Sequence, residues 1–229
     1  HNRAKGMANA VLRKVAGAGL TLTDLHASRI PEWLRDPLVM AWGEDIVAAC
    51  ETAQSRPAPL DLTPRDPATT KTLAETLNAT VLPTGTLRIT GNVQVTALPG
   101  YDTGEWWAQD AAAAIPVRVL NPQQGEKVLD LCAAPGGKTL QLAAAGAEVT
   151  ALDISERRMA RVKDNLERTG LTASMIVGDA LEHEAEPYDA ILLDAPCSAT
   201  GTIRRHPDLP FAKDGSEFGE LIGLQAQMI

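Results

Sequence analysis

The stretch that decides the fold is residues 126–170, EKVLDLCAAPGGKTLQLAAAGAEVTALDISERRMARVKDNLERTG. Two short apolar runs, 126–131 and 148–153, are typical of buried strands, and each is followed by a helical pattern. The second helix is predicted to begin after Ser155, a favoured N-cap residue, and to end at Gly170. This alternation predicts an α/β fold whose parallel sheet is covered by helices on both faces.

The same pattern continues in residues 174–179 and 188–196, which predict two further strands of that sheet. An acidic residue stands at or just after the end of each of the last three strands: Asp153, Asp179 and Asp194. Ligands of parallel sheets bind beyond the carboxyl ends of the strands. We therefore expect the three carboxylates to lie at one ligand-binding edge, although acids that serve only as helix caps are the structural alternative.

The turn after the first strand, residues 132–138 (CAAPGGK), contains two glycines and leads into the N-terminus of a helix, which favours a ligand there. Neither phosphate-binding pattern fits, because the Walker loop needs glycine where Cys132 stands and G-x-G-x-x-G is absent. Asp153 can accept hydrogen bonds from a ribose, and Asp179 from an adenine amino group. A nucleoside pocket without a phosphate site indicates S-adenosylmethionine; a purely structural strand–helix turn is the alternative.

Residues 194–197, Asp-Ala-Pro-Cys, follow the fourth strand. Enzymes that methylate exocyclic amines place Asn-Pro-Pro-aromatic here, which presents carbonyl groups to the nitrogen. A thiol at Cys197 instead fits methylation of carbon 5 of a pyrimidine, because that carbon becomes nucleophilic only after a thiolate adds at carbon 6. A small residue that merely packs the loop is the structural alternative.

Several strings in the second half resemble one family in order and spacing: LDLCAAPGGKT, ALDISERRMARVKDNLERTG, VGDA and LLDAPCSATGTIRRHPD. They resemble the RsmB/Sun branch of the Nol1/Nop2/Sun family of RNA 5-methylcytosine methyltransferases. The upstream LPGYDTGEWWAQDAAA is similar to that family's lead-in to its catalytic domain. The resemblance implies a Rossmann-like class I S-adenosylmethionine-dependent methyltransferase domain that acts on a flipped or single-stranded cytosine of ribosomal RNA.

The resemblance also implies roles for individual residues. Asp194 and Cys197 are the expected catalytic residues, and Asp194 would hydrogen-bond nitrogen 3 of the cytosine ring. No metal is expected. The expected cofactor-binding residues are Cys132, Ala133, Ala134, Pro135, Gly136, Gly137, Lys138, Asp153, Arg158, Asp179 and Asp194, and the expected RNA-phosphate contacts are Arg204, Arg205 and His206. For Arg158 and for the last three residues, a solvated surface position is the alternative.

The family uses two cysteines: the one in Asp-Ala-Pro-Cys assists product release, and the nucleophile lies in a later Thr-Cys-Ser motif. No Thr-Cys-Ser occurs in this sequence. The resemblance therefore implies that the nucleophile lies beyond residue 229 and that this chain alone is inactive. Two alternatives stay open: Cys197 is itself the nucleophile, as in DNA cytosine methyltransferases, or the protein is a non-catalytic RNA-binding or ribosome-assembly factor that retains the cofactor pocket.

The first half is less distinctive. The patterns predict helices up to about residue 55, a linker over 55–70, a helix over 70–80, a hairpin over 86–98 turning at Gly91 and Asn92, and a helix over 105–120. The resemblance implies a NusB-like helical RNA-binding end in residues 1–30 and a small α+β RNA-binding module in 31–104. The methyltransferase domain would then occupy residues 105–229, incomplete at its C-terminus.

Composition limits the class of protein. Of 229 residues 45% are apolar and the net charge is −8, which fits a globular protein and argues against an unselective nucleic-acid coat. Between Arg3 and Arg35, however, there are six basic residues and only two acidic ones. This positive segment is either a solvated helix surface or a contact with phosphate groups. Three scattered cysteines, with neither a secretory signal nor a membrane span, predict a cytoplasmic location.

Overall fold

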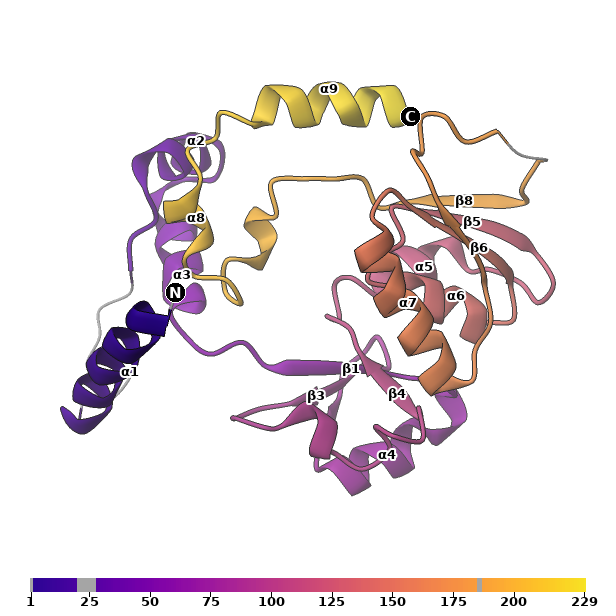
Figure 1. Cartoon of the computed structure of the whole chain (residues 1–229), viewed down its shortest axis with the longest axis horizontal. Coiled ribbons are helices and arrows are strands. Elements are labelled where there is room, and N and C mark those ends of the chain that lie inside the picture. Colours follow the sequence, from indigo (N-terminus) through magenta and orange to yellow (C-terminus); the bar gives the residue numbers. More distant parts are fainter. Residues whose placement is uncertain (1, 20–27, 185–186) are drawn as a thin grey trace. The chain divides into compact units, whose positions relative to one another are not determined.

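The computed structural model describes residues 2–19, 28–184 and 187–229 (Figure 1). Residues 20–27, which belong to the segment predicted to be helical and to the expected first domain, lie outside this description. Among the described residues, no helix is long and apolar enough to cross a membrane.

Contacts between residues divide the chain into two compact units, and each unit joins segments that are distant in sequence. Unit 1 consists of His1–Ala58 and Ala199–Ser216, and unit 2 of Pro59–Ser198 and Glu217–Ile229. These units do not follow the domain limits expected at residues 30 and 104.

Unit 1 is helical. Its helices are α1 (Asn2–Gly17), α2 (Glu32–Trp42), α3 (Glu44–Gln54) and α8 (Leu209–Ala212), with a 3₁₀ turn at Thr200–Thr202. The helices predicted up to about residue 55 include α2 and α3, which are separate because Gly43 between them has a φ of 85° that a continuous helix does not allow. The apolar core joins both segments of the unit: Ile30, Leu34, Val47 and Ile203.

Unit 2 begins with an antiparallel sheet in the order β2-β3-β1-β4. Its strands are β1 (Leu60–Pro64), β2 (Thr80–Val81), β3 (Leu87–Ile89) and β4 (Trp106–Ala108), and it also includes helix α4 (Thr70–Leu77) and 3₁₀ turns at Pro67–Thr69 and Val95–Ala97. Leu62, Leu87 and Trp106 are fully buried between the sheet and α4. This sheet with its helix is called the antiparallel module below.

Three sequence predictions for this region were wrong. The predicted linker contains β1, a central strand of the sheet. The predicted hairpin does not form, because both edges of β3 are already paired, with β2 and β1, and the residues after Gly91 turn into a 3₁₀ helix instead. The predicted helix over 105–120 begins instead as strand β4, because Trp106 and Trp107 are buried by pairing with β1.

The second sheet of unit 2 is parallel, as predicted, in the order β7-β6-β5-β8. Its strands are β5 (Lys127–Leu131), β6 (Glu148–Asp153), β7 (Ser174–Val177) and β8 (Ala190–Leu193); its helices are α5 (Ile115–Leu120), α6 (Gly137–Ala144) and α7 (Glu156–Thr169). The predicted limits of α7 are confirmed, since Ser155 accepts a hydrogen bond from the Arg158 N–H and Gly170 ends the helix at a φ of 66°. A last helix, α9 (Phe218–Met228), closes the described chain.

Helices α5, α6 and α7 pack on one face of the parallel sheet (Figure 1). On the other face Leu129, Leu131 and Leu152 pack against neighbouring strands and the loop before β8, and no helix of the described residues contributes to that cluster. Coverage by helices on both faces, which the apolar strands predicted, is therefore not what the described residues show. Ile191 of β8 and Val177 of β7 remain exposed.

Candidate functional site

The loop after β5 is held against the end of β6 by one buried carboxylate. Asp153 is only 2% exposed, and its two oxygens accept hydrogen bonds from the N–H groups of Ala134 (3.1 Å) and Ser155 (2.9 Å). The Arg158 guanidinium lies 3.5 Å from Asp153 and also donates to the carbonyl of Ala134. The sequence-predicted residues of the 132–138 loop, Asp153 and Arg158 thus form one connected structure.

A second contact joins the same loop to β8. The Nζ of Lys138, in the first turn of α6, donates to Oδ2 of Asp194 at 2.6 Å. Asp194 follows β8, the neighbour of β5 on the side opposite β6, so it stands where the strand order reverses. That reversal is the usual ligand-binding point of an open parallel sheet. The Asp194 side chain is 56% exposed, so it can meet a ligand.

Asp179 lies beyond the end of β7, and its side chain makes a local contact. Its Oδ1 accepts a hydrogen bond from the N–H of Leu181 at 2.9 Å, which stabilises the turn that follows β7. The preceding Gly178 N–H donates to the backbone carbonyl of Asp153, so β6 and β7 end side by side. The three acids therefore lie at one edge of the sheet, Asp153 and Asp179 at the ends of the adjacent strands β6 and β7, and Asp194 after β8 on the other side of β5.

Sequence reasoning did not select Asp130, a fully buried carboxyl within β5. Its Oδ2 accepts a hydrogen bond from the Thr139 hydroxyl at 2.6 Å, whereas Oδ1 has no partner. Burial raises the pKa of this carboxyl to about 6, despite the Thr139 hydrogen bond and the nearby positive charge of Lys138. The signal in the sequence was an acid inside an otherwise apolar strand.

The N-terminus of α6 carries no side-chain cap, because its N-cap residue is Gly136. Its first backbone N–H groups have no carbonyl partner within the helix and are available to an anionic group. Gly136 has a φ of 102°, and a Cβ there would lie 3.2 Å from a methyl group of Val162 in α7. Backbone conformation and packing on α7 therefore account for this glycine, and contact of its backbone with a ligand stays a prediction.

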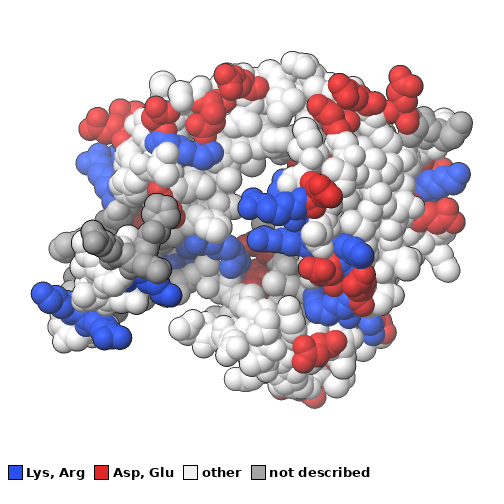
Figure 2. All heavy atoms as spheres, in the orientation of Figure 1, with Lys and Arg blue, Asp and Glu red and all other residues white. Residues whose placement is uncertain are grey.

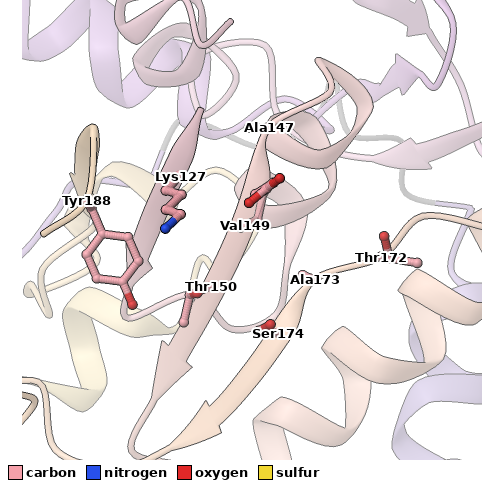
Figure 3. Close-up of a pocket in the computed structure, with 9 residues that line it drawn as sticks. Lys127, Ala147, Val149, Thr150, Thr172, Ala173, Ser174 and Tyr188 are labelled. Carbon is pink, nitrogen blue, oxygen red and sulfur yellow. The ribbon is translucent and has the colours of Figure 1, made fainter. Parts of the chain in front are cut away.

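A cavity of about 360 Å³ opens beside the Lys138–Asp194 pair, between the antiparallel module and the 132–138 loop. Asp130 also lines it, whereas Asp153 and Asp179 do not. A larger cavity of about 530 Å³ lies at the amino ends of β5, β6 and β7, where Lys127 and Tyr188 face it (Figure 3). Because ligands of such sheets bind at the carboxyl ends, the smaller cavity is the candidate site.

The three cysteines differ in their surroundings. Cys197 is exposed on the loop after β8, and the carbonyl of its neighbour Pro196 accepts a hydrogen bond from Gln225 of α9. Cys132 is half-buried with a φ of 62°, and burial raises the pKa of its thiol, so it is a poor nucleophile. Cys50 is exposed on α3 in unit 1. Cys197 is thus the only one of the three that is both exposed and near Asp194 in the chain.

The expected RNA contacts lie in unit 1. Arg204 donates hydrogen bonds to the carbonyls of Arg56 and Pro57, so part of its guanidinium holds its own unit together. Arg205 and His206 are exposed. In unit 2, Lys and Arg side chains lie over α7, with Asp and Glu among them (Figure 2).

Comparison with known proteins gives consistent matches. Residues 117–229 match the family described as 16S rRNA methyltransferase RsmB/F. The chain is 39% identical to ribosomal RNA small subunit methyltransferase B of Klebsiella pneumoniae over 243 aligned positions, covering 98% of this chain and 56% of that protein. The chain thus spans about half the length of the curated relatives that it matches.

Solved structures agree on the fold. The structure of PH0851 is similar with a TM-score of 0.78 and 27% sequence identity, and the match covers 87% of this chain and 48% of PH0851. A methyltransferase homolog protein from Pyrococcus horikoshii is similar with a TM-score of 0.66 and 28% sequence identity, and the match covers 84% of this chain and 65% of that protein. Both match across the antiparallel module and the parallel sheet, because neither sheet alone spans that share of the chain.

Proposed function

The chain belongs to the RsmB/F family of 16S rRNA methyltransferases, and we propose that it is the cofactor-binding part of an enzyme that methylates carbon 5 of a cytosine in small-subunit ribosomal RNA. The observation that carries this proposal is the Lys138–Asp194 pair, which stands at the strand-order reversal beside a cavity lined by the 132–138 loop. The methyl donor in this proposal is S-adenosylmethionine.

The residues at the edge of the sheet fit that cofactor. S-adenosylmethionine supplies a methyl group on a positively charged sulfonium and carries a carboxylate, an ammonium group and a ribose. The uncapped N–H groups of α6 suit the carboxylate, and the unpartnered Oδ1 of Asp130 and the exposed Asp194 suit the positive groups. Asp153 holds the ribose in this proposal: its Oδ1 accepts one backbone hydrogen bond and keeps a lone pair for a ribose hydroxyl, whereas Oδ2 accepts from Ala134 and also lies 3.5 Å from Arg158.

The pair of Lys138 and Asp194 can stabilise the charge that develops on the cytosine ring when a thiolate adds at carbon 6. The ring then gains electron density, and a hydrogen-bond donor at nitrogen 3 or at the carbonyl oxygen stabilises it. An ionised carboxylate only accepts hydrogen bonds, but an ammonium has three donors, and Lys138 uses one of them on Asp194. We therefore assign the donor at nitrogen 3 or at the carbonyl oxygen to the Lys138 ammonium, in place of the contact expected from Asp194, and Asp194 orients that ammonium.

The adduct-forming thiol in this proposal lies beyond residue 229, and Cys197 assists release of the methylated base. Cys197 is exposed three residues after Asp194, so its thiol can approach the same base.

The activity is tested with the complete protein, unmodified small-subunit ribosomal RNA and tritiated S-adenosylmethionine. We expect Lys138→Met and Asp194→Asn each to lower kcat at least about 100-fold, the range typical of a lost oxyanion-type donor. Lys163→Met, which removes a lysine paired with Glu167 on α7, is the control and should retain full activity. A complete wild-type protein that binds the RNA but transfers no methyl group would show that it is an assembly factor instead.

The two thiol roles are separated by trapping. In the complete protein, Cys197→Ala should accumulate a covalent protein–RNA adduct that survives denaturing electrophoresis, because release is slowed while addition proceeds. Cys50→Ala is the matched control and should accumulate none. A Cys197→Ala protein that never forms the adduct would make Cys197 the nucleophile.

A further inference from the structure

Gln109 is a buried amide at the junction of the two sheets of unit 2. It directly follows β4 and is only 7% exposed, and its backbone N–H donates to the carbonyl of Asp61 in β1 at 3.0 Å. No role follows for it from the expected cofactor or RNA contacts. A buried side-chain amide is costly unless its donors and acceptor are all satisfied, so its partners define what it does.

The partners of Gln109 fix the orientation of its amide. Its Oε1 accepts hydrogen bonds from the Thr63 hydroxyl (2.8 Å) and from Nε1 of Trp107 (3.0 Å). Because the indole nitrogen can only donate, the atom that faces it must be the amide oxygen. The amide nitrogen therefore points the other way, where it donates to Oε1 of Gln141 (3.0 Å) and, at a longer 3.5 Å, to the carbonyl of Ala113.

Through this amide the antiparallel module reaches α6. Gln141 lies in α6, and its Nε2 donates in turn to the carbonyl of Ala114 at 2.9 Å, which extends the hydrogen-bond chain to the residue before α5. About one turn earlier in the helix, a Cβ on Gly137 would lie 3.6 Å from the Gln109 side chain, so Gln109 packs on the first residue of α6. The next residue is Lys138, whose ammonium contacts Asp194.

We infer that Gln109 is a positioning residue that holds the N-terminus of α6, and with it the 132–138 loop and Lys138, in the geometry of the candidate site. Thr63 and Trp107 orient its amide, and its nitrogen joins that amide to α6. The antiparallel module is then a part of the reaction site's support, in addition to any contact it makes with RNA. The effect on the cofactor rests on the proposed function; the effect on the loop does not.

The test replaces the nitrogen by an oxygen. Gln109→Glu keeps the size of the side chain and the acceptor for Thr63 and Trp107, but it presents an oxygen to the acceptors of Gln141 and Ala113. We expect hydrogen exchange at residues 133–140 to rise about tenfold or more while the amides of β5 and β6 exchange as before. In the same chain, affinity for S-adenosylhomocysteine measured by calorimetry should fall about tenfold, or 1.4 kcal/mol.

Gln123→Glu, the same replacement at an exposed glutamine whose side-chain amide donates locally to the carbonyl of Asn121, is the control and should change neither measurement. Thr63→Val should also raise hydrogen exchange at residues 133–140 and lower the affinity for S-adenosylhomocysteine, because it removes one donor that orients the Gln109 amide and leaves Gln109 in place. Unchanged exchange at 133–140, or an increase spread equally over all strands, overturns the positioning role. Absence of S-adenosylhomocysteine binding by the wild-type chain would instead overturn only the proposed function.

Discussion

At the scale of single residues, Asp130 shows how the site departs from what stability alone would favour. Its carboxyl is fully buried with one oxygen unpartnered, and burial raises its pKa to about 6. In the unfolded chain the same carboxyl titrates near 4. The folded form therefore binds the proton more tightly, and stability falls as the pH rises from about 4 to about 6 and then stays level. An ionised Asp130 destabilises the fold at neutral pH.

Asp130→Asn removes this titration and can keep the acceptor for Thr139. The stability of the variant relative to wild type should therefore increase by about 3 kcal/mol between pH 3 and pH 7, since each unit of pKa shift corresponds to about 1.4 kcal/mol. Urea unfolding of both proteins at a series of pH values measures the difference. A difference that does not change with pH would contradict the raised pKa.

At the scale of elements, the C-terminal end of α7 is where the parallel sheet meets the antiparallel module. Arg168 donates to the carbonyls of Tyr101 (2.8 Å) and Trp106 (3.1 Å), and its guanidinium lies 4.5 Å from the centre of the Tyr101 ring. Arg65 of the module donates to the carbonyl of Thr169 at 2.8 Å, a favourable position for a cation at a helix C-terminus. Gly104 lies against the same turn of α7.

Gly104→Ala tests this junction. A Cβ at Gly104 would lie 2.0 Å from the carbonyl oxygen of Arg168, and the φ of 64° is itself unfavourable for alanine. Gly125 has a similar φ of 81° but open space around it, so Gly125→Ala carries the backbone cost alone. We expect Gly125→Ala to cost about 1–2 kcal/mol of unfolding free energy and Gly104→Ala about 2 kcal/mol more, measured by urea unfolding. Equal costs would show that α7 does not pack closely on this segment.

At the scale of the whole molecule, unit 1 is closed by a segment far along the chain. Ile203 packs with Ile30, Leu34 and Val47, although about 150 or more residues separate it from each of them. The helices of unit 1 therefore depend on residues that follow β8. Within the same unit, Arg35 is buried between Glu44 and Glu51, and these hydrogen bonds raise the pKa of its guanidinium and keep it charged.

Ile203→Ala should lower the stability of unit 1 by about 2–5 kcal/mol, the usual cost of truncating a buried aliphatic side chain to alanine. Hydrogen exchange should then accelerate in α2 and α3 and stay unchanged in β5 and β6. Ile222→Ala, at an exposed position of α9, is the control and should alter neither. Slow exchange of α2 and α3 in Ile203→Ala would contradict the composition of unit 1.

The positions of three acids at one edge of the sheet were predictable from the sequence, because buried parallel strands appear as short apolar runs and the residue after each run lies at that edge. Of Asp153, Asp179 and Asp194, only Asp194 lines the candidate cavity, and the roles of all three stay predictions. Asp130 was missed because the pattern treats a strand's interior as packing. Gln109 was missed because residues 105–120 were predicted to be one helix, in which it would be an ordinary surface position.

The sequence by itself determined the parallel sheet, the limits of α7 and the family, because periodicity, caps and motif strings are properties of neighbouring residues. Only the tertiary structure decided that Trp106 and Trp107 form a strand, since their partners in β1 lie more than 40 residues away. It also decided that Lys138 meets Asp194, 56 residues further on, and that Gln109 joins Thr63 to Gln141. Local patterns set the conformation and buried face of a segment, but which distant edge or side chain completes it depends on where the chain returns.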